Sequence, residues 1–145
     1  MQPPSLGDVA YAAGFFDGEG WISIGKQGRA AHNLYLIIGV AQKNLSPLLW
    51  VQARWGGSMY YAKSSGVTQL TMSGGRGSRF LQDVLPFLQV KRAAALVALQ
   101  FHSLMGKEKR GRGHPLPPAA IKERLSLKAV LQALNRSNGV TDIAP

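Results

Sequence analysis

Apolar and polar residues alternate along two stretches in the first half of the chain, and each stretch predicts a β-hairpin. In the first hairpin, strands are expected over 21–27 and 33–42, with a loop at 28–32. In the second, strands are expected over 59–63 and 67–72, joined at Ser64-Ser65-Gly66. A period of two between turn signals is typical of strands that bury one face. The first hairpin is expected to bury Ile22, Ile24, Leu34, Leu36, Ile38 and Val40.

Helical signals lie before, between and after the hairpins. Ser5 is placed to cap a helix and Asp8 stands where a capping box has an acid, so a first helix is expected from about residue 5 to Asp17. A second helix is expected to open at Ser46-Pro47, because proline is favourable at the first helical position. This second helix is expected to end at Gly56-Gly57, and further helices are expected from Ser78 to Pro86, over 91–105 and over about 118–135.

This order of elements predicts a single α+β domain with an αββαββα core over about 5–105. The sheet is expected to be antiparallel and curved, with helices on one face and the other face open. A basic segment over 106–118 is expected to link the core to an additional C-terminal helix at 118–135. The bases of this linker are Lys107, Lys109, Arg110 and Arg112.

The charge balance indicates a polyanionic partner. The chain holds 17 Lys and Arg against 7 acids, and all ten units of its net charge of +10 come from residue 51 onward. Such an excess in one small domain favours a nucleic acid over an anionic membrane surface or a basic protein without such a partner. No apolar run reaches the roughly 18 residues of a membrane span. The absence of cysteine excludes disulfides and thiolate metal sites.

Asp17 and Glu19 are the candidates for chemistry, because they lie two residues apart at the end of the first predicted helix, beside Gly18 and Gly20. Carboxylates there face the negative end of the helix dipole, at a cost of roughly 0.3–1 kcal/mol each. In a polyanion-binding protein such a pair needs a cation. Mg²⁺ fits, since it takes carboxylate oxygens and shares phosphate oxygens. The alternative interpretation is a simple helix stop followed by a turn.

The segment 12–20, AAGFFDGEG, resembles the signature of the LAGLIDADG homing endonucleases. Ala12 stands for the first Leu, Phe15-Phe16 for the Leu-Ile pair and Glu19 for the second Asp. Two further segments resemble the family in the correct order. Residues 40–43 (VAQK) look like the end of its second strand, and 85–91 (LPFLQVK) look like the segment that delivers a lysine to its catalytic site. The resemblance covers about 5–105 and implies the fold described above.

The resemblance also implies roles for individual residues. Glu19 would bind Mg²⁺, with Mn²⁺ as a substitute, and the carbonyl of Gly18 would help. Gln42 and Lys91 would line the same site and organise water or neutralise charge near the phosphate. Asp17 belongs to this catalytic set, although it is expected to hold helix ends together more than to bind metal. For Gln42 the alternative is an ordinary polar residue at a strand end.

A single motif in one chain implies a homodimer, because in this family two motif helices pack side by side and bring two acids to one centre. The first helix carries a narrow face of small residues suited to such a contact across a two-fold axis. The residues of this expected dimer interface are Ala10, Ala13, Gly14 and Asp17.

The open sheet face is expected to bind double-stranded DNA, since a β-ribbon fits the major groove. Two half-sites one turn apart imply a partly symmetric target of roughly 20 bp. Arg79 and the basic linker, together with Arg29 and Arg76, are expected to contact phosphates. The full set of expected DNA-binding residues is Ser23, Gln27, Arg29, Asn33, Tyr35, Ile37, Tyr61, Lys63, Gln69, Thr71 and Arg76.

The sequence therefore predicts a site-specific homing endonuclease that makes a metal-dependent double-strand break. A rival hypothesis is a non-cleaving relative that assists intron RNA splicing or regulates transcription. Such relatives lose the acids, and this chain keeps Asp17 and Glu19. A third reading, an unrelated basic RNA-binding α+β protein, requires the motif to be accidental.

Overall fold

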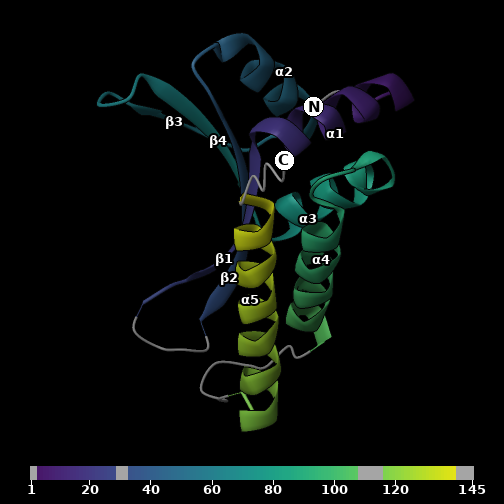
Figure 1. Cartoon of the computed structure of the whole chain (residues 1–145), viewed down its shortest axis with the longest axis vertical. Helices are drawn as coiled ribbons and strands as arrows, with labels where there is room; N and C mark the ends of the chain where they lie inside the picture. The colour runs from purple at the N-terminus through teal and green to yellow at the C-terminus, as the bar shows by residue number, and fades with distance from the viewer. Residues whose placement is uncertain (1–2, 29–32, 108–115, 140–145) are drawn as a thin grey trace, which may run out of the picture.

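The structure is a computed structural model that describes residues 3–28, 33–107 and 116–139 of the chain (Figure 1). The predicted α+β class and the αββαββα order are confirmed. Arg29 and residues 108–115 of the predicted basic linker lie outside the described residues. The elements in chain order are α1 (Leu6–Glu19), β1 (Gly20–Lys26), β2 (Leu34–Gln42), α2 (Leu45–Trp55), β3 (Ser58–Ala62), β4 (Val67–Ser73), α3 (Gly74–Val84), the 3₁₀ helix η1 (Leu85–Phe87), α4 (Arg92–Lys107) and α5 (Pro118–Gly139).

The four strands form one antiparallel sheet in the order β1-β2-β4-β3. In β1 and β2, Ile22 pairs with Ile38, and Val40 pairs in turn with Leu70 of β4. Paired residues share a face, so these side chains point to the same side of the sheet. All six positions that alternation assigned to the core of the first hairpin are buried, which confirms that part of the prediction.

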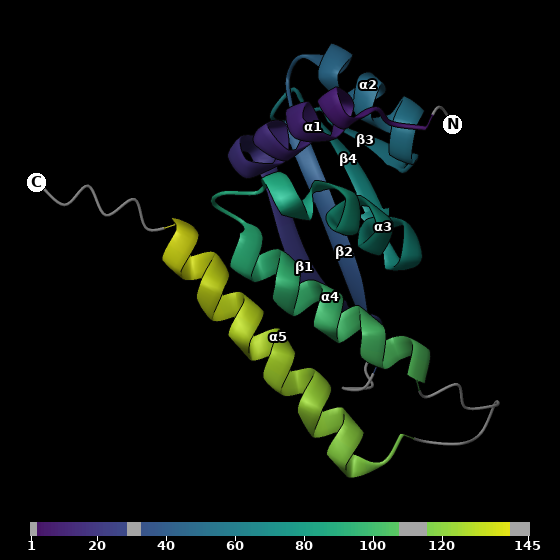
Figure 2. The same cartoon turned by 90° about the vertical axis from the view of Figure 1, so that its right-hand side faces the viewer.

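Helices cover one face of the sheet and leave the other open. Figure 2 shows α1, α3 and α4 lying across the sheet, and the core they form with it contains Phe16, Phe80 and Phe101. In Figure 1 the β1–β2 and β3–β4 hairpins diverge toward the left, away from these helices. The open face is therefore concave between the two hairpin ends.

The start of α1 agrees with the sequence analysis. The Ser5 hydroxyl accepts from the Asp8 N–H at 3.1 Å, and the Asp8 carboxylate accepts from the Ser5 N–H at 3.1 Å, which completes the capping box. These backbone contacts and the Arg54 guanidinium, 3.0 Å away, hold the pKa of Asp8 below its usual value. The helix continues two residues past Asp17, so both acids of the motif lie in its last turn.

Two predicted helix starts were wrong. α2 begins at Leu45 because the Asn44 side chain, rather than Ser46, forms the N-cap and accepts from the Ser46 N–H at 3.0 Å. α3 begins at Gly74 rather than at Ser78. Glycine disfavours helix in isolation, but a Cβ at Gly77 would lie only 2.9 Å from the Met72 carbonyl oxygen. Close packing of α3 on β4 thus overrides local propensity.

α5 confirms the predicted C-terminal helix and extends it to Gly139. It packs against α4 and the edge strand β1, as Figure 2 shows. Leu131 and Arg124 on its inner side are 1% and 5% exposed. Near its end, the Asn135 side-chain amide donates to the Ile22 carbonyl of β1 at 2.8 Å. α5 thereby covers part of the free edge of the sheet.

Among the described residues, no helix is long and apolar enough to cross a membrane.

Candidate catalytic site and nucleic-acid interface

Asp17 joins the end of α1 to the start of α4. Its carboxylate accepts three backbone N–H groups, from Gln89 at 2.7 Å, Val90 at 3.1 Å and Lys91 at 3.0 Å. The N–H groups that precede a helix lack intrahelical partners, so a carboxylate stabilises that end of α4. The expectation that Asp17 ties helix ends together agrees with these bonds. They leave its oxygens little capacity for a metal, which speaks against a direct catalytic role.

Lys91 is positioned by the same junction. Its ammonium donates to the Asp17 carbonyl oxygen at 2.6 Å, which places a cation at the last turn of α1. Burial lowers the pKa of Lys91, and the negative charges of Asp17 and Glu19 oppose that shift. The ammonium therefore lies close enough to both acids of the motif for their charges to raise its pKa. The two segments that carry the resemblance, 12–20 and 85–91, meet in space at this point.

Glu19 is the free carboxylate of the site. It is the last residue of α1 and is exposed to solvent, and no hydrogen bond to it is found among the described residues. The neighbouring carbonyl of Gly18 also lies in the last turn, where carbonyls lack helical partners. Carboxylate and carbonyl oxygens are ligands that hard divalent cations such as Mg²⁺ accept. The residues present therefore fit a metal, and Glu19 and Gly18 are the ones that would hold it.

One chain by itself supplies few ligands for that metal. Within the described residues, no three His, Cys, Asp or Glu side chains gather in one place. Because Asp17 is occupied by backbone N–H groups, Glu19 stands as one carboxylate at one helix end. The described part of one chain therefore offers a single unoccupied carboxylate at this helix end.

Gln42 lies near this site but is turned toward its own loop. Its side-chain oxygen accepts from the Lys43 N–H at 2.9 Å and the Asn44 N–H at 3.5 Å. In the described part of the chain, no hydrogen bond joins it to Glu19 or Lys91. The β1–β2 register brings the end of β2 close to Glu19, since Val40 pairs with Gly20. Gln42 as a catalytic residue remains a prediction.

The strand register assigns five of the eleven predicted DNA-binding residues to the open face. Gly39 pairs with Thr71 and Ala41 with Gln69 on that face, opposite the buried Leu70. Gln27 and Asn33 are exposed where the β1–β2 hairpin continues past its strands, joined by a bond from the Gln27 N–H to the Asn33 carbonyl at 2.7 Å. The predicted residues that lie on the open face of the strands are Ser23, Tyr35, Ile37, Gln69 and Thr71.

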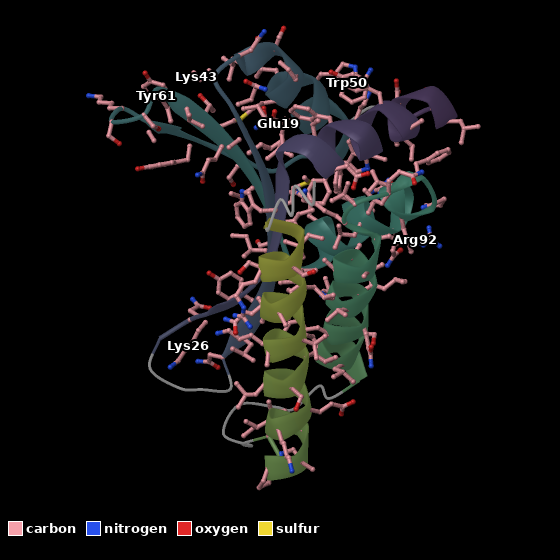
Figure 3. All side chains as sticks on the ribbon, in the orientation of Figure 1. Glu19, Lys26, Lys43, Trp50, Tyr61 and Arg92 are labelled. Carbon is pink, nitrogen blue, oxygen red and sulfur yellow. The ribbon has the colours of Figure 1, made fainter. Side chains whose placement is uncertain are left out.

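The phase predicted for β3 was wrong. Tyr61 pairs with Thr68, whose side chain is buried on the helix side, so Tyr61 lies on the opposite side of the sheet from the residues of the open face. Figure 3 shows Tyr61 on the upper side of its hairpin, away from the concave face. Lys63 is in the turn after the strand. Tyr60, which pairs with Gln69 and is 65% exposed, takes the place assigned to Tyr61.

Exposed lysines mark the ends of the hairpins. Lys26 ends β1, Lys43 follows β2 and Lys63 lies in the β3–β4 turn. Figure 3 shows Lys26 and Lys43 at opposite ends of the sheet and Arg92 on the helix side. Arg76 is exposed on α3, with its guanidinium beside Gly56 at the end of α2. Lys26 and Lys63 thus lie near the tips of the two hairpins that border the concave face, whereas Arg76, which was predicted to contact DNA, lies in the helical layer on the other side of the sheet.

The predicted dimer face needs one correction. Ala13 is fully buried inside the chain, because α1 packs on the sheet and α3 through this side, so Ala13 cannot contact another molecule. Ala10 and Gly14 are exposed and Asp17 is partly exposed. A Cβ built on Gly14 would meet nothing within 4 Å. The accessible small-residue face is therefore shifted around the helix from the predicted one.

Three residues near the site were not predicted, namely Trp21, Tyr60 and Asn135. Trp21 faces outward by alternation and lies flat over β2, where a Cβ on Gly39 would be 2.5 Å from its ring. The apolar Met59 packs against the core, so its neighbour Tyr60 points to the opposite face of the sheet. Met59 is therefore the residue from which the face of Tyr60 could have been predicted. Nothing in the sequence indicates Asn135, because it lies 113 residues after Ile22, its partner in β1.

Known proteins resemble this chain in their three-dimensional structure. No family model and no curated protein sequence matches the chain. Among solved structures, the homing endonuclease I-CvuI in complex with a DNA target matches with a TM-score of 0.73 and 25% identity, over 87% of this chain and 80% of that one. The archaeal intron-encoded homing endonuclease I-Vdi141I, complexed with DNA, matches with a TM-score of 0.72 and 18% identity, over 87% and 82%.

A longer relative shows the same likeness. The LAGLIDADG meganuclease I-AabMI, bound to uncleaved DNA, matches with a TM-score of 0.67 and 20% identity. The match covers 83% of this chain but 43% of that protein, so this chain corresponds to less than half of it. Against I-CvuI and I-Vdi141I, by contrast, the chain corresponds to most of the other protein.

Proposed function

We propose that this chain, which has the fold of the LAGLIDADG homing endonucleases, cuts double-stranded DNA at a specific site as a metal-dependent homodimer. The observation that carries the proposal is the junction of α1 and α4, where the free Glu19 carboxylate lies near the Lys91 ammonium. This junction is combined with a concave, cation-bordered sheet face on the same chain. I-CvuI, I-Vdi141I and I-AabMI, which share the fold, are described in complexes with DNA.

Phosphodiester hydrolysis needs an activated water and a stabilised leaving oxygen, and a bound Mg²⁺ supplies both effects. Glu19 and the Gly18 carbonyl would hold the ion, with Mn²⁺ as a substitute. Lys91 places positive charge where the phosphate becomes more negative, and its partial burial strengthens that interaction. Asp17 keeps Lys91 in place through the backbone bonds to residues 89–91.

A dimer through α1 would complete the ligand set with Glu19 from a second copy. Apolar side chains flank the exposed small residues of α1, including Leu6 at 74% and Tyr11 at 54% exposure. Leu45 and Leu49 of α2 are also exposed, at 45% and 49%. Aromatic side chains are common anchors of protein interfaces, and exposed apolar patches of this kind mark interaction sites.

A bulky residue at Gly14 is expected to break the dimer and leave the monomer folded. The side chain meets nothing within its own chain, and replacing a helical glycine adds up to about 1 kcal/mol of stability. The matched control is Gly75→Arg on α3, which is equally open within the chain. Sedimentation should show wild type and Gly75→Arg as dimers and Gly14→Arg as a monomer. A wild-type monomer, on and off DNA, would contradict the dimer.

The corrected strand phase makes a second prediction. Tyr60→Ala should weaken specific DNA binding by roughly tenfold, about 1.4 kcal/mol, as expected for losing one base or sugar contact. Tyr61→Ala should change it less than twofold, because Tyr61 lies on the other side of the sheet. Both variants remove an exposed tyrosine from the same strand, so each controls for the other. Equal losses in an equilibrium binding titration would contradict the assigned faces.

The direct test of cleavage is to incubate the protein with Mg²⁺ and a large DNA library and to sequence the new ends. The proposal expects recurrent ends at a partly symmetric site of roughly 20 bp. If no ends recur, binding to intron RNA is measured next. Tight RNA binding without any nicking of DNA would replace the endonuclease by the splicing hypothesis.

A further inference from the structure

The geometry points to Asn135 of α5 as a positioning residue for the catalytic segment, an inference that rests on the proposed function. The Asn135 side chain joins α5 to the sheet. Its amide donates to the carbonyl of Ile22, three residues after Glu19. The backbone between them, 20–22, is the start of the edge strand β1.

Asn135 also closes one wall of the hollow beside the catalytic junction. This hollow has a volume of about 380 Å³, and its other walls come from the end of α1, the start of β1 and the segment before α4. The residues around it besides Asn135 are Asp17, Gly18, Gly20, Trp21, Val90 and Lys91. α5, which lies outside the αββαββα core, thus contributes directly to the surroundings of Lys91 and of the candidate metal-binding carbonyl of Gly18.

The helix is held firmly enough for one amide to act as a positioning contact. One turn before Asn135, Leu131 is 1% exposed against the core. Because α5 is already ordered by this packing, the amide bond costs little additional side-chain entropy. The hydrogen bond also occupies a carbonyl on an edge strand that has no neighbouring strand on that side.

The start of β1 is held from within the core on one side only. The Gly20 N–H bonds to the Phe16 carbonyl, and Gly20 pairs with Val40 of β2. The other side of β1 has no neighbouring strand, because β1 is the edge of the sheet. Asn135 restrains the backbone from that edge, while Asp17 restrains it from the α4 side. Asn135 therefore sets the position of Glu19 relative to Lys91 without touching the substrate.

The test compares Asn135→Leu with Gln132→Leu. Leucine keeps the size of Asn135 and favours helix but cannot donate, and Gln132 offers a matched exposed position on the same helix. The selected DNA target is cut in single-turnover reactions with Mg²⁺, and its Kd is measured without metal. Hydrogen exchange of the peptide covering 18–24 is followed in parallel.

Asn135→Leu is expected to slow the cleavage rate constant roughly 10- to 100-fold, the size expected when reacting groups are displaced by up to about 1 Å. The Kd and the reaction amplitude should stay at the wild-type values, and exchange over 18–24 should become faster. Asn135→Gln should recover part of the rate, because it keeps the amide donor. Gln132→Leu should behave as wild type.

A wild-type rate constant in Asn135→Leu would overturn this inference and leave the proposed function intact. A loss of amplitude or of DNA binding at an unchanged rate constant would also overturn it, because that result describes a purely structural role. If the wild-type protein cuts no DNA at all, the proposed function fails and the positioning role of Asn135 in cleavage fails with it.

Discussion

Glu19→Gln should reduce DNA cleavage by roughly 10³-fold or more, since the charge that a metal contributes to the transition state is worth several kcal/mol and each tenfold loss corresponds to about 1.4 kcal/mol. Glutamine keeps the size of the side chain and one oxygen but loses the negative charge. Glu19 is exposed and accepts no hydrogen bond among the described residues, so the substitution should leave folding unchanged. The measurement is the single-turnover rate on the selected target with Mg²⁺.

The DNA affinity of Glu19→Gln should respond differently from its cleavage rate. Removing a negative charge from a protein that binds a polyanion should leave the Kd unchanged or tighten it. Glu123→Gln on α5 makes the same chemical change at another exposed position and should cut like wild type. If Glu19→Gln cuts at the wild-type rate, Glu19 is not a metal ligand, and the metal chemistry proposed for this motif is wrong.

Asp17→Asn is expected to produce the largest loss of stability, about 2–3 kcal/mol. The carboxylate accepts three backbone N–H groups, and a hydrogen bond to a charged group contributes about 1.5–3 kcal/mol, less where solvent competes. Asparagine loses the charge and directs an NH₂ group at donors. The free energy of unfolding is measured by urea denaturation, with the slope m checked for a two-state transition.

Asp83→Asn is the matched control for this change. Asp83 accepts one bond, from the Trp55 indole N–H at 2.9 Å, and the asparagine oxygen can still accept it. Its loss of stability should therefore be less than about 1 kcal/mol. Asp17→Asn should also slow cleavage, because Lys91 depends on the same junction. Equal stabilities of the two variants would show that the junction of α1 and α4 does not depend on the Asp17 charge.

Local chemistry explains which features could be predicted from the sequence. The first hairpin follows from a period-two pattern in which buried and exposed positions differ clearly in polarity, as at Ile22 and Ile38. The start of α1 follows from Ser5 and Asp8, since a capping box forms between residues three apart. The expectation that Asp17 joins helix ends also agrees with the structure. Asp17 could be singled out because it belongs to the motif at 12–20.

The errors arise where local signals were weak. β3 is short and carries adjacent tyrosines, so its phase depends on pairing with β4, and a one-residue shift exchanges Tyr60 with Tyr61 between the two faces. The start of α3 depends on contacts of Gly77 with β4, which no helix propensity reports. Ala13 belongs to a small-residue stripe in the sequence, and only packing determines which part of that stripe stays accessible.

The sequence by itself therefore determined the order of helices and strands, the excess of positive charge and the candidate acids, because each depends on residues close together in the chain. Only the tertiary structure decided which faces are exposed, that the Lys91 ammonium bonds to the Asp17 carbonyl, and that Asn135 reaches β1 from the last helix. These contacts join residues about 70 to 110 positions apart. Their formation depends on how the whole core packs, and no local pattern records that.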